Sequence, residues 1–278
     1  MPEFSLSAPV LHDYPSVTDQ LTAWHVPKSW RFWLRQHQGV TVNDDYRYGN
    51  LAVHAGETIQ LKLSAVDPTD YVHQVHPFDI IYEDDQVLVV NKPAGIKPHP
   101  NQPGEVDTLM NWVAAYLAPN PAYITHRLDK LTSGLTLIAK DPLTQSLINQ
   151  QLAAKTMTRE YVALVSGNIP DAGVIDARIG HDPDDKRKRM VRADGDHAVT
   201  HYRVIQRNGD IARVWLTLET GRTHQLRVHL ASIGFPILGD PLYGDELAAP
   251  RLMLHGAKLS WIKPLSETLQ TVECPAEF

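Results

Sequence analysis

The sequence predicts an α+β fold: a mostly antiparallel or mixed sheet with flanking helices, preceded by a small αβ domain. Short strand-like runs follow one another through turn signals such as Asn208-Gly209, which is typical of a hairpin. A few helical segments with apolar stripes lie between these runs, and such helices usually cover a sheet. The chain has 278 residues, which is enough for about two domains.

The N-terminal part is expected to form a helix followed by a small sheet. Residues 29–37 fit a short helix with two opposite faces. Its apolar face consists of Trp30, Trp33 and Leu34. Its basic face carries Lys28, Arg31 and Arg35. Extended segments and turns follow, ending in a strand over 58–63. Residues 64–78 contain prolines and no clear period, which indicates a linker, so we divide the chain into domains 1–72 and 73–278.

The larger part alternates strands with a few helices. Strands are expected over 80–82, 87–90, 159–165, 174–179, 198–206 and 211–218. Asp107 is suited to cap a helix with an apolar stripe from Leu109 to Leu117. Asp141, followed by Pro142, predicts a second helix that runs to about residue 154. A third helix is expected over 223–232.

Composition excludes several classes of protein. A hydrophobic fraction of 43% and a charged fraction of 21% are typical of a globular chain, not of a disordered one. No run of about 18 apolar residues is present, so no membrane-spanning helix is expected. The first residues lack the basic start and apolar segment of a signal peptide. Cys274 is the single cysteine and cannot form an internal disulfide, which fits a cytoplasmic protein.

Charge is distributed unevenly along the chain. The net charge of −6 argues against a protein that coats nucleic acid without specificity. Residues 178–229, however, contain eleven Lys and Arg against seven Asp and Glu, whereas residues 1–80 contain five against nine. A basic face on the C-terminal part is therefore possible despite the negative net charge.

Metal and nucleotide motifs are missing from the sequence. The close histidine pairs, at 73/76, 197/201 and 224/229, lie in no HExxH pattern and have no cysteine ligand beside them. Neither a GxxxxGK[ST] nor a GxGxxG loop occurs, and no GxSxG elbow is present. We therefore expect no metal, no nucleotide cofactor and no serine-esterase chemistry.

Two segments gather polar residues of several kinds. Residues 122–141 place Arg127 and Asp129 close together between two strand-like runs, at the kind of loop where catalytic groups often stand. Residues 219–244 place Arg222 just before a helix whose start could bind an anion. On the residues alone, a salt-bridged turn and a capped helix explain these segments as well as a catalytic site does.

Four ordered motifs resemble those of RluA-type pseudouridine synthases. Residues 126–141, HRLDKLTSGLTLIAKD, resemble the central signature of that family. Residues 91–100 resemble its first motif, 159–167 the segment that supplies its tyrosine, and 221–244 its third motif. The segment 39–61 is similar to the latter half of the ribosomal S-four-type RNA-binding domain, here in a degenerate form because the preceding helix is poor in cations and carries tryptophans.

The resemblance implies roles for three catalytic residues. Asp129 would be the catalytic aspartate, acting on the sugar, on the base or on a ribose proton. Arg222 would pair with Asp129 and keep it ionised. Tyr161 would stack on the uracil, and its hydroxyl could take the proton from carbon five. Further residues expected to contact the substrate are Arg127, which would occupy space near the flipped base, Leu226, which would close the pocket, and Thr132, Lys92 and His126.

The expected partner is RNA, with ribosomal RNA favoured over transfer RNA, and the expected enzyme is a monomer without cofactor. Two basic groups would contact phosphates. The first consists of Lys186, Arg187, Lys188 and Arg189, in a predicted hairpin; the second consists of Lys28, Arg31 and Arg35. Two alternatives remain from the sequence. One is an RNA-binding or ribosome-assembly factor without catalysis. The other is a glycoside hydrolase, which needs two carboxylates about 5 to 10 Å apart.

Overall fold

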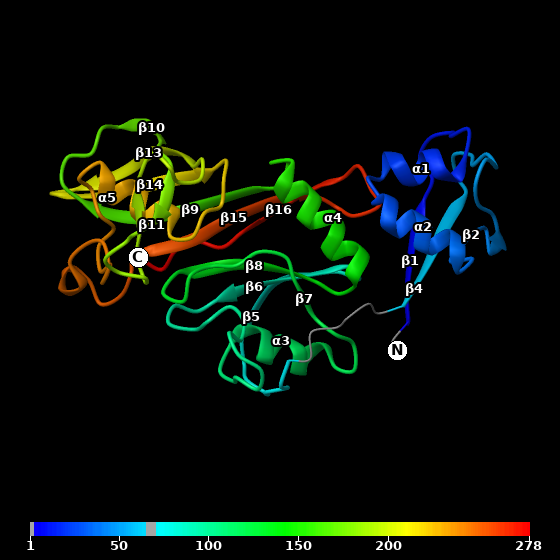
Figure 1. Ribbon diagram of the computed structural model, residues 1–278, viewed down its shortest axis with the longest axis horizontal. Helices are drawn as coiled ribbons and strands as arrows, with labels where there is room; N and C mark the ends of the chain where they lie inside the picture. Colours follow the sequence, from blue (N-terminus) through cyan, green and yellow to red (C-terminus); the bar gives the residue numbers. More distant parts are fainter. Residues whose placement is uncertain (1–2, 65–70) are drawn as a thin grey trace.

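The computed structural model describes residues 3–64 and 71–278 and confirms the α+β class (Figure 1). Part of the predicted linker, residues 65–70, lies outside the described residues. The N-terminal unit contains β1 (Glu3–Pro9), α1 (Val17–Ala23), α2 (Lys28–Gln36), β2 (Val40–Val42), β3 (Asp45–Tyr46) and β4 (Thr58–Ser64). The next strand of the chain begins at Asp79. The domain division at residues 72 and 73 stays a prediction.

The small sheet has the order β1-β4-β2-β3, with every pair antiparallel. Alternate residues of β4 are buried because successive side chains of a strand face opposite sides of the sheet. Helix α2 places Leu34 in this core and packs Trp30 and Trp33 against it, as the sequence predicted. Strand β1 and helix α1 were not predicted.

The second unit is built on a large mixed sheet with helices beside it. Its elements are β5 (Asp79–Glu83), β6 (Val87–Lys92), α3 (Leu109–Leu117), β7 (Tyr123–Ile124), β8 (Ser133–Ala139), α4 (Pro142–Ala153), β9 (Thr158–Ser166), β10 (Ala172–Asp176), β11 (Ile179–His181), β12 (Arg189–Val191), β13 (Val199–Asn208), β14 (Ile211–Leu218), α5 (Gln225–Ser232), the 3-10 helix η1 (Glu246–Ala248), β15 (Leu254–Ile262) and β16 (Leu269–Glu273). The main strand order is β10-β13-β14-β9-β15-β8-β6-β5, and β11 pairs with β12 in a separate hairpin.

One parallel contact joins the two halves of the large sheet. Strands β8 and β15 pair in parallel at their starts, where Gly134 lies opposite Gly256. A Cβ on Gly134 would lie 2.4 Å from the backbone nitrogen of Gly256, and the φ angle of Gly134 is +117°. Both facts favour glycine at this position. The close approach fixes the start of β8, and with it the loop that precedes β8.

Local signals located most element ends correctly. Asp141 caps α4 by accepting a hydrogen bond from the Thr144 amide at 2.8 Å, and Asn208-Gly209 lies between β13 and β14 as predicted. The predicted cap of α3 was wrong. Thr108 is the N-cap residue, while Asp107 has a φ of 60° and its carboxylate accepts from the Gln74 amide. The predicted strand over 174–179 is divided between β10 and β11.

The two units share buried contacts through α4. Leu143 and Leu147 of α4, together with Leu265, belong to the same hydrophobic cluster as the core of the small sheet. Figure 1 shows α4 on the side of the large sheet that faces the N-terminal unit. The N-terminal unit therefore packs against the second unit instead of being joined to it only by the linker.

Candidate active site

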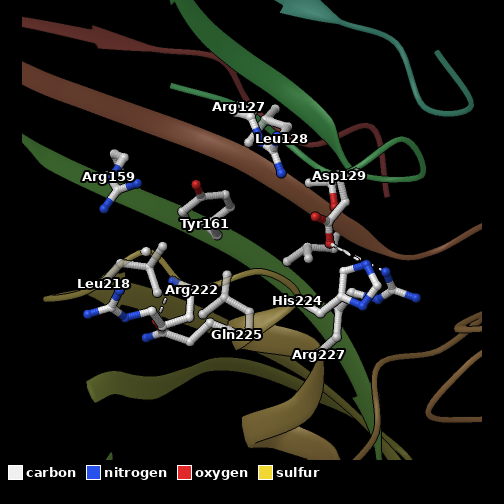
Figure 2. Close-up of a pocket in the computed structure, with 14 residues that line it drawn as sticks. Arg127, Leu128, Asp129, Arg159, Tyr161, Leu218, Arg222, His224, Gln225 and Arg227 are labelled. Carbon is white, nitrogen blue, oxygen red and sulfur yellow. Dashed lines mark hydrogen bonds and ion pairs between the residues drawn. The ribbon is translucent and has the colours of Figure 1, made fainter. Parts of the chain in front are cut away.

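A pocket opens where the loop before β8 meets β9, the end of β14 and the start of α5 (Figure 2). It contains about 430 Å³ of empty space. The lining residues are Arg127, Leu128, Asp129, Thr132, Arg159, Tyr161, Leu218, Gly221, Arg222, His224, Gln225, Leu226, Arg227 and Leu254. The three predicted catalytic residues, and the predicted contacts Arg127, Thr132 and Leu226, are thus brought to one place from distant parts of the chain.

Asp129 is held by an arginine on the first turn of α5. Arg227 Nη1 donates to Asp129 Oδ2 at 3.3 Å. The other side of the same guanidinium donates from Nε and Nη2 to both oxygens of Asp240, each at 2.8 Å. The Asp240 side chain is fully buried. Burial alone would raise the pKa of Asp240, but the hydrogen bonds and charge of Arg227 hold that pKa below its ordinary value. The pair fixes a positive charge beside Asp129.

Arg222 does not pair with Asp129, so that part of the prediction was wrong. Its Nη1 lies 3.5 Å from Asp196 Oδ2, and its Nε donates to the carbonyl of His197 at 3.2 Å. The reason is where α5 begins. Arg222 lies in the loop before Gln225, the first residue of α5, whereas Arg227 lies within the helix and faces the interior. Arg222 still lines the pocket, and its catalytic role stays a prediction.

A second group reaches Asp129 from the same turn. His224 has a left-handed backbone with φ of 58°, and its Nε2 lies 3.8 Å from Asp129 Oδ2. On the other side of the ring, Nδ1 is 2.8 Å from Tyr243 Oη, which itself accepts from the Arg189 amide at 2.8 Å. Burial lowers the pKa of His224, although the charge of Asp129 opposes this. A neutral ring that accepts from Tyr243 presents its Nε2–H to Asp129.

Tyr161 forms the aromatic wall of the pocket. It projects from β9, and its side chain is almost completely buried. Burial raises the pKa of its phenol; the charge of Arg159 opposes the shift and that of Asp129 adds to it. Leu226 and three other leucines supply apolar surface around the ring. The pocket therefore offers an aromatic ring with apolar neighbours next to one carboxylate.

Thr132 shapes the loop that carries Asp129. Its side chain is buried, and its amide donates to the Asp129 carbonyl at 3.1 Å, which closes a tight turn. Gln225 does the same for the loop before α5. Its Oε1 accepts from the Arg222 amide at 3.0 Å, and its Nε2 donates to the Val199 carbonyl at 3.0 Å. Both loops are thus fixed by hydrogen bonds at their base.

Lys92 is a positioning residue, contrary to the prediction that it contacts substrate. It is fully buried, and its ammonium donates to the carbonyls of Pro93, Ile96 and Lys130 at 2.8, 2.9 and 3.2 Å. Burial lowers the pKa of Lys92 to about 7, and the charge of Asp129 opposes this. Lys92 ties residues 93–96 to the residue that follows Asp129.

His126 also has a structural contact. Its Nε2 accepts a hydrogen bond from the Leu137 amide at 3.0 Å, so it anchors the approach to the Asp129 loop onto β8. Burial lowers the pKa of His126 to about 3, and the charge of Arg159 adds to that effect. The ring is neutral at physiological pH. It borders a second hollow beside the pocket, and its contact with substrate stays a prediction.

Arg159 was missed by the sequence analysis. It lies two residues before Tyr161 on β9, and it lines both the pocket and the second hollow. A lone arginine in an alternating strand is usually a surface residue, so the sequence pattern gave no reason to select it. The structure shows the contact that the sequence could not: a Cβ at Gly221 would lie 2.8 Å from Arg159 Nη1.

The predicted RNA-binding residues form two separate groups. Lys186, Arg187 and Lys188 lie in the turn between β11 and β12, and Arg189 begins β12. A third hollow lies between this hairpin and residues 221–223, so the hairpin adjoins the pocket. Figure 1 shows α2, with the second group, at the opposite end of the molecule from α5 and β11.

Within the second group, Lys28 and Arg35 are exposed, whereas Arg31 is half-buried and donates to the Thr22 hydroxyl. Within residues 3–64 and 71–278, no cluster of three His, Cys, Asp or Glu side chains is placed to hold a metal ion. No helix in the part of the chain that the structure describes is long and apolar enough to cross a membrane.

Comparison with known proteins identifies the family. Residues 86–232 match the family described as RNA pseudouridylate synthase, and residues 4–59 match the RluD ribosomal pseudouridine synthase N-terminal domain. The uncharacterized RNA pseudouridine synthase YhcT of Bacillus subtilis is 37% identical over 251 residues, which cover 87% of this chain and 83% of the relative. The ribosomal large subunit pseudouridine synthase D of Xanthomonas campestris is 38% identical over 234 residues, covering 77% and 70%.

A solved structure gives the same result. Human RNA pseudouridylate synthase domain containing 1 superimposes with a TM-score of 0.63 at 27% identity, covering 75% of this chain and 87% of that one. The motifs, the pocket and these relatives agree, and the predicted resemblance to RluA-type enzymes is confirmed. The chain belongs to the RNA pseudouridine synthases, isomerases that act on uridine in RNA.

Proposed function

We propose that this chain isomerises specific uridines in large-subunit ribosomal RNA, with Asp129 as the catalytic carboxylate. Several relatives at 36 to 38% identity, among them those of Xanthomonas campestris and Pasteurella multocida, are named ribosomal large subunit pseudouridine synthase D. The observation that carries the catalytic assignment is the chain of ion pairs from Asp240 through Arg227 to Asp129 at the pocket. Arg227 is buried and donates hydrogen bonds to both carboxylates, so it gives Asp129 a fixed position and a fixed counter-charge.

The reaction needs one well-placed carboxylate. It breaks the bond between C1′ of the ribose and N1 of uracil, forms a bond from C1′ to C5, and replaces the proton that C5 releases with one that N1 takes up. Asp129 is the one carboxylate among the described residues that line the pocket. It would act on the sugar, on the base or on a ribose proton. Burial raises the pKa of the Tyr161 phenol. Its ring would stack on the base, and its hydroxyl stays the predicted acceptor of the C5 proton.

The same observation weakens the glycoside hydrolase alternative. Such enzymes place two carboxylates on either side of the bond that they break, about 5 to 10 Å apart. The second carboxylate near Asp129 is Asp240, which is fully buried beneath Arg227 and bonded through both oxygens. It cannot reach a sugar. The family relationship, in turn, favours an enzyme over a binding factor without catalysis.

A uridine in folded RNA must leave its helix to enter the pocket, at a cost of a few kcal/mol. Arg127 is exposed at the rim and reaches toward the pocket in Figure 2. It would occupy the space that the flipped base leaves. The basic hairpin over 186–189 adjoins the pocket and would contact phosphates beside it.

Release of tritium from RNA labelled at C5 of uridine tests the catalytic assignment. Asp129→Asn should abolish release and leave RNA binding nearly unchanged, because the amide keeps the shape of the side chain but not its charge. Asp184→Asn, in the exposed hairpin turn, is the matched control and should stay active. Turnover by the Asp129→Asn protein would contradict the assignment. Pseudouridine mapping in total RNA from cells with and without this gene identifies the target, and an unchanged map of the large-subunit RNA would exclude it.

The N-terminal unit is proposed to contact RNA through Lys28 and Arg35, with Arg31 held partly by Thr22. Neutralising all three should lower the slope of log affinity against log salt by roughly 1.5, about two phosphate contacts' worth. The catalytic step should change little, because this surface lies at the far end of the molecule from the pocket. Equal affinity at every salt concentration would show that the unit is a scaffold. The monomeric state is part of the proposal, and light scattering on the purified protein tests it.

A further inference from the structure

A second hollow continues from the pocket toward the end of α4. The two share Arg127, Asp129, Arg159, Gly221 and Arg222, and the second extends to residues 152–155 and 219–223. Its lining includes the charged side chains of Lys155 and Glu219 in addition to the shared residues. In Figure 2, Arg159 and Arg222 lie on the side of Tyr161 opposite Asp129, and Arg127 reaches in from another edge. Positive charge thus collects at the end of the pocket away from the carboxylate.

Two of these arginines have no partner. Arg227 is bonded to Asp129 and Asp240, and Arg222 lies near Asp196. Among the described residues, neither the Arg127 nor the Arg159 side chain makes a hydrogen bond or an ion pair, and Arg159 Nε is buried without an acceptor. A buried donor without an acceptor costs about 1 to 3 kcal/mol, and here the donor belongs to a guanidinium that lines both hollows.

Gly221 makes room for the Arg159 guanidinium. A Cβ at this position would lie 2.8 Å from Nη1 and 2.9 Å from Nη2. Any larger residue would push the guanidinium out of the place it occupies at the edge of the hollow. The absence of a side chain at Gly221 therefore leaves the space that the Arg159 guanidinium occupies.

The carboxylate across the hollow does not neutralise this charge. Glu219 lines the far wall, but its Oε1 is 2.6 Å from His201 Nε2 and its Oε2 is 3.5 Å from Lys155 Nζ. Glu219 is thus already shared between two basic groups. Asp129, the other carboxylate at the hollow, is paired with Arg227. The hollow keeps an excess of positive charge on Arg127 and Arg159.

We propose that Arg159, with Arg127, forms a subsite for a phosphodiester group next to the target uridine. This inference rests on the proposed function, because it places a uracil on Tyr161 and its ribose toward Asp129. Uracil is uncharged and does not need two free guanidinium groups. The neighbouring phosphate is the anionic group that a nucleotide in this position brings to the second hollow, and a guanidinium fork binds phosphate oxygens in pairs.

Binding of the trinucleotide UpUpU to the full chain tests the subsite without turnover being measured. Two analogues, each with one phosphodiester replaced by an uncharged methylphosphonate, show which phosphate is bound. The parent protein should bind one analogue about tenfold or more weakly than UpUpU. Arg159→Met should bind UpUpU more weakly than the parent by the same factor. It should then bind UpUpU and that analogue equally well, because the substitution and the methylphosphonate remove the same contact. Arg159→Lys should keep part of the affinity because it keeps the charge.

Arg203→Met is the matched control, since it removes one exposed positive charge outside both hollows and should leave all three affinities unchanged. Thermal midpoints within about 1 °C of the parent show that the variants fold. The subsite is refuted if Arg159→Met still distinguishes the analogue, or if the parent never does. It is also refuted as a substrate site if inorganic phosphate competes as strongly as UpUpU. Tritium release by the parent is measured separately: an inactive parent overturns the proposed function, whereas an active parent with an indifferent Arg159→Met overturns only the subsite.

Discussion

Replacing Arg227 should lower both the stability of this protein and its activity, and a second substitution should restore only the stability. Arg227→Met removes the guanidinium between a fully buried Asp240 and the half-exposed side of Asp129. Asp240 keeps the amides of Leu242 and Tyr243 but loses its counter-charge. Leaving one charge of a buried pair without its partner costs about 3 to 5 kcal/mol. In a chain of this size that lowers the thermal midpoint by about 6 to 20 °C.

The loss should depend on pH in a definite direction. In the parent, the pKa of Asp240 is held below its ordinary value, so the pair stabilises the fold above that ordinary value and the benefit disappears as pH falls through the lowered pKa. In Arg227→Met, burial without a cation raises the pKa of Asp240, so the variant loses stability as pH rises. The difference between the two proteins should therefore be smaller at pH 3 than at pH 7. Urea unfolding at both values measures it.

A double variant tells whether Arg227 also acts on the reaction. Arg227→Met with Asp240→Asn removes both buried charges and should recover most of the lost stability, because neither group is then left charged and unpaired. Tritium release should stay about 10- to 100-fold below the parent, since Asp129 still lacks its charged hydrogen bond. Recovery of activity together with stability would refute a direct effect of Arg227 on Asp129. An unchanged midpoint in the single variant would refute the account of the buried pair.

Two further predictions concern groups behind the pocket. Tyr243→Phe removes the hydroxyl that contacts His224 Nδ1. We expect kcat to fall several-fold with little change in KM. An unchanged kcat across pH 6 to 8 would show that Tyr243 does not position the histidine. Lys92→Met removes a lysine whose pKa is lowered to about 7 by burial, while its unfolded value is near 10.4. Between these two pKa values the unfolded chain binds more protons than the folded chain. The parent should therefore gain stability relative to Lys92→Met as pH rises from 7 to 10. A difference in unfolding free energy that stays constant over this pH range would contradict the prediction.

Features with a local cause could be predicted from the sequence. The Asn208-Gly209 turn and the Asp141 cap depend on the conformation of a few neighbouring residues, and both were located correctly. Contacts between distant segments had no such signal. The parallel pairing of β8 with β15 joins residues about 120 positions apart, and the pairing of β1 with β4 joins residues about 50 to 60 positions apart. Neither pairing is marked by a turn, so neither could be placed in advance.

In the site, too, the identity of the residues could be predicted from the sequence, but their contacts could not. Asp129 and Tyr161 were selected because motifs identify residues, and the structure brings them into one pocket. The partner of Asp129 depends on where α5 begins: a helix that starts at Gln225 turns Arg227 inward and leaves Arg222 in the preceding loop. The expected helix start, two residues earlier, hid this difference. The sequence motif contains both arginines, and only the position of the helix start shows which of them contacts Asp129.

Helix α4 links the two surfaces that are proposed to contact RNA. Leu143 and Leu147 near its start are packed in the N-terminal core, while Leu152 and Ala153 at its end border the second hollow. Twelve helical residues span about 18 Å and bend little, so the N-terminal unit has a fixed offset from the pocket. An RNA that uses both surfaces must therefore present its target uridine and a distant stretch of phosphates at one separation. We therefore expect a folded RNA with that spacing to gain affinity from both surfaces, whereas a short single strand gains affinity from the pocket alone.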